Sequence, residues 1–342
     1  MNKDFLFRLI ETPSPSGAEL AIQKVVMEEM KPYVDTFITH HSYNLISVIH
    51  PEDAFKVLLC GHIDEIGLMI TDIQDNGLIH VTNTGNSVGY MYVGQHVQVL
   101  TKKGIIHGVF ANTDVVKEHF KISDLLLDIG TYTKDESSKL VQVGDYVVHS
   151  FTHQELQNNT LSARALDDRL GAFIILEAIK QAKDAKVGLY AATTVGEETT
   201  TRGATFATNI VKPTIGIIVD VTHTTDHDGK APSKGLIRLG GGPAITIGSI
   251  ISPVLLELVE ESSKRQGIQL QYEVSSERTY TDSDKVHFLQ NGIPVLLISI
   301  PLRYMHSSVE VCNYQDVLDI IALISDLLIH LDPNQNFDPF KK

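Results

Sequence analysis

The segment Leu189-Tyr-Ala-Ala-Thr-Thr-Val-Gly-Glu-Glu198 begins with small, apolar and β-branched residues and ends with two adjacent acids. The apolar part is typical of a buried strand, which Gly196 would end. Because side chains alternate along a strand, Glu197 and Glu198 need not point the same way. One acid could then bind a metal while the other moves a proton. The plainer interpretation, two solvated acids at the end of a strand, stays open at this point.

Apolar runs of the same kind alternate with helical patterns on both sides of this segment. The sequence Ser16-Gly-Ala-Glu19 predicts a capping box, with Ser16 as the N-cap, ahead of a helix that carries apolar residues at helical spacing. Further helices are expected at 167–182, 252–266 and 314–330, and strands at 36–40, 45–49, 56–60, 215–219, 269–274 and 294–300. This alternation predicts an α/β domain whose sheet is covered by helices on both faces.

The hydrophobic pattern changes between about Gly67 and Phe151. Turn sequences there separate short alternating runs at 68–70, 78–81, 97–100, 105–110 and 146–149, and 114–120 could form a turn or two of helix. Such a pattern predicts a small all-β module built from hairpins. We therefore expect a discontinuous catalytic domain at 1–66 and 156–342, interrupted by a β-rich domain at 67–155.

Composition excludes several classes of partner. The net charge of −14 argues against nucleic acid, because phosphate binding needs a basic face. No apolar run is long enough to span a membrane, and the first residues lack the apolar core of a signal peptide. The two cysteines, Cys60 and Cys312, lie in apolar sequence and fit a reducing compartment. We expect a cytoplasmic protein with neither a nucleic-acid nor a membrane partner.

Residues that can bind metals stand at the ends of the apolar strands and at the start of a helix. They are His62, Asp64, Asp167, Asp168, Glu197, Glu198, Asp220 and His306. Sites in open α/β sheets form beyond the carboxyl ends of the strands, so these residues can converge. Each has a structural interpretation alone: the aspartates could cap a helix or end a strand, and either histidine could be satisfied in the fold. Together, nitrogen and oxygen ligands suit zinc, cobalt or manganese, and the carboxylates are too many for one closed structural zinc.

Five motifs, in this order along nearly the whole chain, resemble the tetrahedral (TET) aminopeptidases. That family comprises glutamyl and deblocking aminopeptidases with two co-catalytic metals, and some relatives carry the label endoglucanase. The motifs are His62-Ile-Asp-Glu-Ile-Gly67, Ala165-Leu-Asp-Asp-Arg-Leu-Gly171, Gly196-Glu-Glu198 with Arg202-Gly-Ala204, Asp220-Val-Thr-His-Thr-Thr-Asp226 and Arg303-Tyr-Met-His-Ser307.

The resemblance implies a metal-binding role for five of these residues. His62 and Asp220 would hold one metal, Glu198 and His306 would hold the other, and Asp167 would bridge both. The peptide bond between Asp167 and the next aspartate is typically cis in relatives. The cofactor implied is a pair of divalent ions, zinc or cobalt, with manganese as an alternative.

The resemblance also implies the catalytic roles and the assembly. Glu197 would be the general base, and Asp64 would accept a hydrogen bond from the far nitrogen of His62. The reaction would be removal of N-terminal residues from short peptides by a water held between ions about 3.5–4 Å apart. The fold implied is a three-layer domain with a mixed sheet plus an inserted barrel or PDZ-like domain, and the assembly is a homo-oligomer, from a dimer to a dodecamer.

Two stretches depart from the family pattern. A Gly-Gly-Thr-Asp-Ala sequence near the site is replaced by Thr279-Tyr-Thr-Asp-Ser283, which puts substrate choice near Tyr280 in question. The usual Pro-Pro-His of the β module is missing, and Ala111-Asn-Thr113 stands there, which bears on the oligomer.

Two other functions remain as alternatives. A glycoside hydrolase would use two carboxylates without metal, but it would leave both histidines idle, and the chain has no tryptophan to stack on sugar. A catalytically silent metal-binding assembly protein would have no need of Glu197. Activity that survives a chelator would favour the first alternative.

Overall fold

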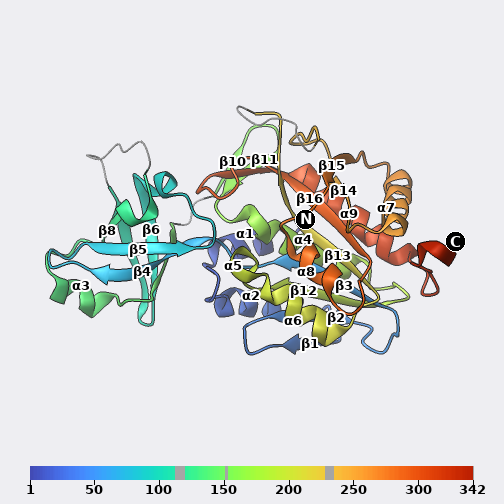
Figure 1. The fold of residues 1–342 in the computed structure, drawn as a ribbon, viewed down its shortest axis with the longest axis horizontal. Coiled ribbons are helices and arrows are strands. Elements are labelled where there is room, and N and C mark those ends of the chain that lie inside the picture. Colours follow the sequence, from blue (N-terminus) through green and yellow to red (C-terminus); the bar gives the residue numbers. More distant parts are fainter. Residues whose placement is uncertain (112–119, 151–152, 228–234, 342) are drawn as a thin grey trace.

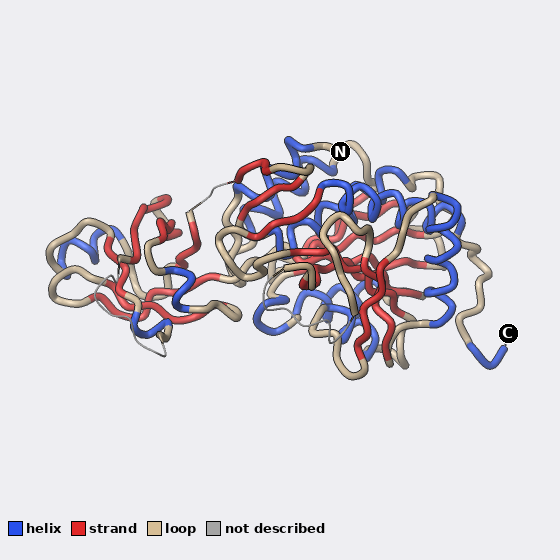
Figure 2. Tube along the Cα trace, turned by 90° about the horizontal axis from the view of Figure 1, so that it is seen from above, coloured by secondary structure: helices blue, strands red, loops and turns tan. Residues whose placement is uncertain are grey.

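The computed structural model describes residues 1–111, 120–150, 153–227 and 235–341. The chain forms a large α/β part and a smaller β-rich part that projects from one side of it (Figure 1). Figure 2 shows the same division after a quarter turn. The fold is therefore mixed α/β with an additional all-β unit, as the sequence predicts.

An eight-stranded mixed sheet forms the centre of the large part, in the order β1-β2-β12-β3-β13-β16-β14-β15. The four neighbours β12, β3, β13 and β16 are parallel, and β2 and β14 pair antiparallel on either side of them. The bounds are β1 (Thr36–Thr39), β2 (Leu45–Ile49), β3 (Lys56–His62), β12 (Gly188–Thr194), β13 (Ile215–His223), β14 (Ala244–Gly248), β15 (Gln271–Ser275) and β16 (Val295–Leu302). Parallel strands that are buried on both faces have nearly continuous apolar sequences, and the sequence therefore predicts these four strands.

Helices cover both faces of this sheet. One group consists of α1 (Lys3–Glu11), α4 (Leu166–Gln181), α7 (Pro253–Gln266) and α9 (Tyr314–His330), in which α9 packs on α4 and α7. The other contains α6 (Arg202–Val211) and α8 (Asp282–Phe288), which pack on each other and on β3. Near these groups lie α2 (Leu20–Met30) and the single-turn α5 (Glu197–Thr200), and η3 (Pro339–Lys341) follows at the end.

The smaller part is a closed antiparallel barrel in the order β4-β5-β8-β7-β6-β9, with its own apolar core. Its strands are β4 (Gly67–Ile73), β5 (Ile79–Thr84), β6 (Gln95–Thr101), β7 (Gly104–Phe110), β8 (Leu126–Asp128) and β9 (Tyr146–His149), with η1 (Gly89–Tyr92), η2 (Ile122–Asp124) and α3 (Lys134–Leu140) between them. The helical turn expected at 114–120 falls mostly outside the described residues, and so does most of the loop at 111–113.

A third, three-stranded sheet joins the returning chain to the site. It contains β10 (His153–Leu156), β11 (Thr160–Ala163) and β17 (Glu310–Asn313), with β11 in the middle. Residues 153–156 therefore share a sheet with strands that lie next to the metal-ligand candidates. The domain limits at 66/67 and 155/156 stay a prediction.

A buried ion cluster lies where the chain leaves for the barrel and returns from it. The Glu65 carboxylate pairs with Arg164 and, at 2.7 Å, with Arg169, whose guanidinium is fully buried. Arg169 also donates to the carbonyl oxygens of Leu9 and Ile10 at 2.7 and 2.8 Å. This cluster ties the first helix, the start of α4 and the exit to the barrel together.

Two local expectations are wrong. Ser16 does not cap a helix: α2 begins only at Leu20, and the Ser16 hydroxyl donates to the carboxylate of Asp64 instead. Tertiary contact has replaced the local cap. The strand expected to end before Asp220 continues to His223, so Asp220 lies within β13.

Both cysteines are free and buried. Among the described residues, none of the helices is long and apolar enough to cross a membrane.

Candidate active site

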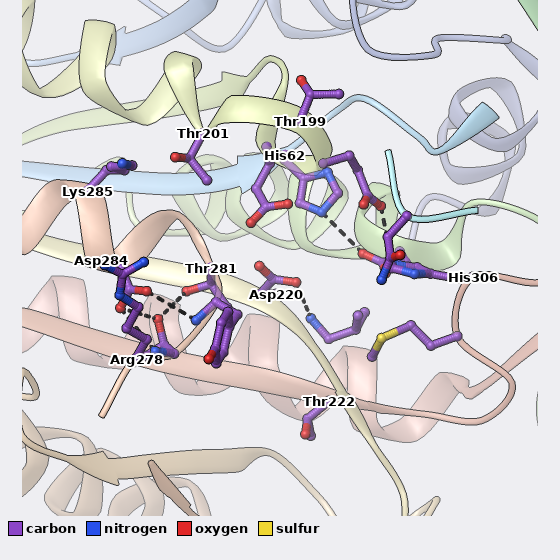
Figure 3. Close-up of a pocket in the computed structure, with 18 of the residues that line it drawn as sticks. His62, Thr199, Thr201, Asp220, Thr222, Arg278, Thr281, Asp284, Lys285 and His306 are labelled. Carbon is purple, nitrogen blue, oxygen red and sulfur yellow. Dashed lines mark hydrogen bonds and ion pairs between the residues drawn. The ribbon is translucent and has the colours of Figure 1, made fainter. Parts of the chain in front are cut away.

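The candidate residues converge at the carboxyl ends of the four central parallel strands. His62 ends β3, Glu197 and Glu198 follow β12, Asp220 lies near the end of β13, and His306 follows β16. With Asp167 at the start of α4, they line one cleft of about 680 Å³. Figure 3 shows His62 and Asp220 facing each other in the middle of this cleft, with His306 at one end.

The carboxylate of Asp167 lies between two imidazoles. Its Oδ1 is 3.1 Å from Nε2 of His62, and its Oδ2 is 3.2 Å from Nε2 of His306. The same nitrogen of His306 lies 3.4 Å from Oε1 of Glu198. A carboxylate with one oxygen toward each imidazole has the arrangement expected of a ligand that bridges two ions.

The other nitrogen of His62 is held by Asp64, but through the backbone. Nδ1 lies 3.1 Å from the carbonyl oxygen of Asp64 and 3.7 Å from its Oδ1. An Nδ1–H donated to that carbonyl leaves the lone pair of Nε2 facing the cleft. The Asp64 carboxylate instead accepts the backbone N–H groups of Glu197 at 3.1 Å and of Glu198 at 3.4 Å.

Asp168 is buried and has a structural role. Its oxygens accept the backbone N–H of His62 and that of Gly171, each at 3.0 Å. The peptide bond between Asp167 and Asp168 is cis, as in the family pattern. Asp168 thus helps to position the end of β3, while Asp167 faces the cleft.

The turn that carries Glu197 and Glu198 is fixed from outside by Arg202. Gly196 has φ +64°, and a Cβ there would collide with the Arg202 guanidinium. That guanidinium donates to Thr199 Oγ1 at 3.2 Å and to the buried carboxylate of Glu19 at 3.1 Å. Glycine adopts this left-handed backbone without strain, and its lack of a Cβ leaves room for the Arg202 guanidinium where it lies.

Glu310 is a residue that the sequence reasoning missed. Its buried carboxylate accepts the backbone N–H of Asp167 at 3.1 Å and that of His306 at 2.7 Å. The signal available in the sequence was an acid four residues after His306, which alone does not indicate a contact with Asp167.

The acids of the site repel one another. Burial raises the pKa of Glu197 to about 10 and that of Asp220 to about 8, and their acidic neighbours add to both shifts. For His306, burial lowers the pKa, but contact with the carboxylates of Asp167 and Glu198 outweighs it and raises the pKa to about 11. A carboxyl group buried among other acids keeps its proton unless a cation lies beside it, so bound cations would favour the ionised form of this cluster.

The donor set fits divalent metal ions. The donor atoms of His62, Asp168 and Asp220 lie within 4.8 Å of one another. The same holds for the donor atoms of His62, Asp167 and Glu198. Imidazole nitrogen with carboxylate oxygen is the set preferred by zinc, cobalt and manganese.

The segment that departs from the family pattern, around Tyr280, lines the outer wall of the cleft. Tyr280 has φ +60°, so tyrosine adopts a backbone conformation that favours glycine, and its side chain is 75 % exposed. Arg278, Lys285 and Phe288 line the same wall, and Figure 3 shows Arg278 and Lys285 on the opposite side of His62 from His306.

Comparison with known proteins gives one consistent result. The sequence model of the M42 glutamyl aminopeptidase family matches residues 44–323. The chain is 29 % identical to a lysyl aminopeptidase of Pyrococcus furiosus, over 98 % of this chain and 99 % of that protein. Among solved structures it is similar to a TET aminopeptidase from a marine sediment Thaumarchaeota archaeon, with a TM-score of 0.91, 29 % identity and coverage of 97 % and 98 %. It is also similar to the Pyrococcus horikoshii TET1 peptidase, which can assemble into a tetrahedron or a large octahedral shell, with a TM-score of 0.86, 30 % identity and coverage of 96 % and 99 %.

Proposed function

Since this chain belongs to the M42 glutamyl aminopeptidase family and is an aminopeptidase, we propose that it uses two divalent metal ions and a glutamate base to release N-terminal residues from short peptides. The observation that carries the proposal is the Asp167 carboxylate, which lies 3.1 and 3.2 Å from the imidazoles of His62 and His306.

We assign the ligands as follows. His62 and Asp220 hold one ion, Glu198 and His306 hold the other, and Asp167 contributes to both. When bound, the ions would supply an activated water and would polarise the scissile carbonyl. Zinc or cobalt is the proposed metal, with manganese as an alternative.

Glu197 is the proposed general base. It lines the cleft beside the assigned ligands. Its backbone N–H donates to the Asp64 carboxylate, and this bond does not involve the Glu197 carboxylate. The carboxylate can take a proton from water and return it to the leaving amine. Bound cations would lower its raised pKa toward the range that this exchange requires.

The alternatives are supported less well by the geometry. Both imidazoles point into the carboxylate cluster, which a metal-free glycoside hydrolase has no reason to arrange. A silent assembly protein needs no acid in the position of Glu197.

We further propose a homo-oligomeric, cytoplasmic enzyme. The assembly is supported by the tetrahedral and octahedral shells of the similar Pyrococcus horikoshii peptidase, and the compartment by two free, buried thiols. A solution mass several times that of the 37.8 kDa chain is expected in sedimentation analysis, and a monomer would contradict it.

The deciding experiment measures metal-dependent turnover. Protein stripped with a chelator should release no chromophore from aminoacyl substrates, and zinc or cobalt should restore release. Full release from aminoacyl substrates after verified metal removal would contradict the two-metal mechanism, and metal-independent hydrolysis of a glycoside would favour the glycoside-hydrolase alternative. No release from any aminoacyl substrate with any of the three metals would contradict the proposal.

A further inference from the structure

We propose that Glu310 is a positioning residue that sets the spacing of two metal ligands that come from elements far apart in the chain. The inference rests on the proposed function, because it concerns the ligands assigned there. One carboxylate holds two backbone amides: Oε2 accepts the N–H of Asp167 at 3.1 Å, and Oε1 accepts the N–H of His306 at 2.7 Å.

Glu310 is itself held rigidly. It is 2 % exposed, and its strand β17 pairs with β11, where Glu310 lies opposite Ala163. The next residue, Val311, exchanges two backbone hydrogen bonds with Arg303, both at 3.0 Å. These bonds close the base of the loop that carries His306, so the carboxylate of Glu310 reaches its partners from a fixed strand.

Both partners depend on such an anchor. His306 has φ +64°, a conformation that a residue other than glycine adopts only where its surroundings enforce it. Asp167 stands at the irregular start of α4, where its φ and ψ are not helical. The two residues belong to elements far apart in the chain, and Glu310 is a direct bridge between their main chains.

The consequence concerns one metal more than the other. The ion assigned to Glu198 and His306 depends on both residues that Glu310 holds, whereas the ion assigned to His62 and Asp220 depends only on Asp167. Groups that orient metal ligands typically contribute 10–100-fold to metal affinity. Loss of Glu310 should therefore lower the affinity for the ion assigned to Glu198 and His306 more than the affinity for the other ion.

The test is a calorimetric titration of metal-free protein with zinc and with cobalt. In Glu310→Gln one oxygen remains, but the amide nitrogen cannot accept the second N–H. One of the two binding steps should weaken by about 10–100-fold, and the other should change less. The visible absorption of bound cobalt should change at the same step, because that ion loses a fixed ligand geometry.

Asp316 provides a matched control. Its buried carboxylate also accepts two backbone N–H groups, from Gly240 and Gly242, each at 2.8 Å, and none of the three residues lines the cleft. Asp316→Asn should destabilise the metal-free protein to a similar extent and leave both binding steps unchanged. Glu310→Asp, which retains the charge but is one methylene shorter, serves as a second variant if Glu310→Gln does not fold.

The outcomes are separable. Wild-type binding of two ions, with unchanged binding in the folded Glu310 variant, would overturn this inference and leave the proposed function in place. Equal weakening by Asp316→Asn would also overturn it, because the effect would then be one of general stability. Failure of the wild-type protein to bind either metal would remove the proposed function, and the inference with it.

Discussion

Glu197 and Glu198 are adjacent in the sequence, yet their surroundings differ. Burial raises the pKa of both carboxyl groups, but His306, which lies 3.4 Å from Glu198, opposes the rise there, whereas the pKa of Glu197 reaches about 10. Under the proposed function, Glu198 binds a metal ion and Glu197 exchanges a proton. Their division of roles can be tested separately.

Glu197→Gln should retain both metals and lose nearly all turnover. Because glutamine cannot take up the proton, kcat should fall by about 10²–10⁴-fold. Metal analysis of the purified variant, together with kcat for one aminoacyl substrate, checks this. Glu198→Gln is the counterpart and should lose one metal equivalent. If the Glu197 variant lost metal while its activity stayed, the two roles would be assigned wrongly.

Tyr280→Gly should widen the cleft without harm to the fold. The left-handed φ of +60° disfavours tyrosine, so the relief of strain offsets the added flexibility of the unfolded chain, and stability should change by less than about 1 kcal/mol. The ratio of kcat/KM for bulky to small N-terminal residues should rise. Tyr43→Gly is the control, because Tyr43 is also a tyrosine with a left-handed φ, +71°, and does not line the cleft. An unchanged substrate profile would exclude Tyr280 from the substrate pocket.

At the scale of elements, the sequence predicts the buried parallel strands and the long helices better than the short strands. The central parallel strands are buried along nearly their whole length and mostly apolar, and α9 begins and ends where the pattern places it, at Tyr314 and His330. The short strands β8 and β17 have no such signal, because pairing across the fold defines them. The metal-ligand candidates that line the cleft could be predicted, because they are acids and histidines at the ends of apolar strands and at the start of a helix. The role of Glu310 was not, because it requires knowing that β17 lies against β11.

Arg169→Met should destabilise the protein strongly. The change leaves Arg164 as the remaining cationic partner of the buried Glu65 carboxylate and removes donors to Leu9 and Ile10, which should lower the free energy of unfolding by about 3–5 kcal/mol. Denaturant unfolding of the metal-free protein measures it. Arg8→Ala, which breaks an exposed pair with Glu28 and a longer, partly buried pair with Glu29, is the control and should cost about 1 kcal/mol or less. Equal losses in both variants would contradict the structural role of the buried cluster.

At the scale of the whole molecule, the barrel joins the α/β part beside the candidate active site. The outgoing chain leaves five residues after His62, and the returning strand β11 ends four residues before Asp167. The barrel strand β9 contributes His149, which is buried and stacks on Tyr92 at 4.0 Å between ring centroids. Within the described residues, neither ring nitrogen of His149 has a hydrogen-bond partner.

His149 should make stability depend on pH. Burial, and to a lesser extent Arg164, lowers its pKa to about 4 from about 6.5. The unfolded chain therefore binds the proton first, and stability is lost as pH falls from about 6.5 to 4, by about 3 kcal/mol in total. His149→Phe keeps the stacked ring and removes this loss. Denaturant unfolding gives the free energy of unfolding of the metal-free wild type and of the variant at pH 7 and at pH 4.5. If stability fell by the same amount between the two pH values in both proteins, the effect would not come from His149.

The exposed ring of Phe288 on the cleft wall has a practical consequence. It is 71 % exposed at the end of α8, in a chain that contains no tryptophan. Phe288→Trp would give the protein a single indole, whose emission could be followed against a background of tyrosine alone. Light from that one residue would then report, in real time, when a peptide enters the cleft and when the product leaves.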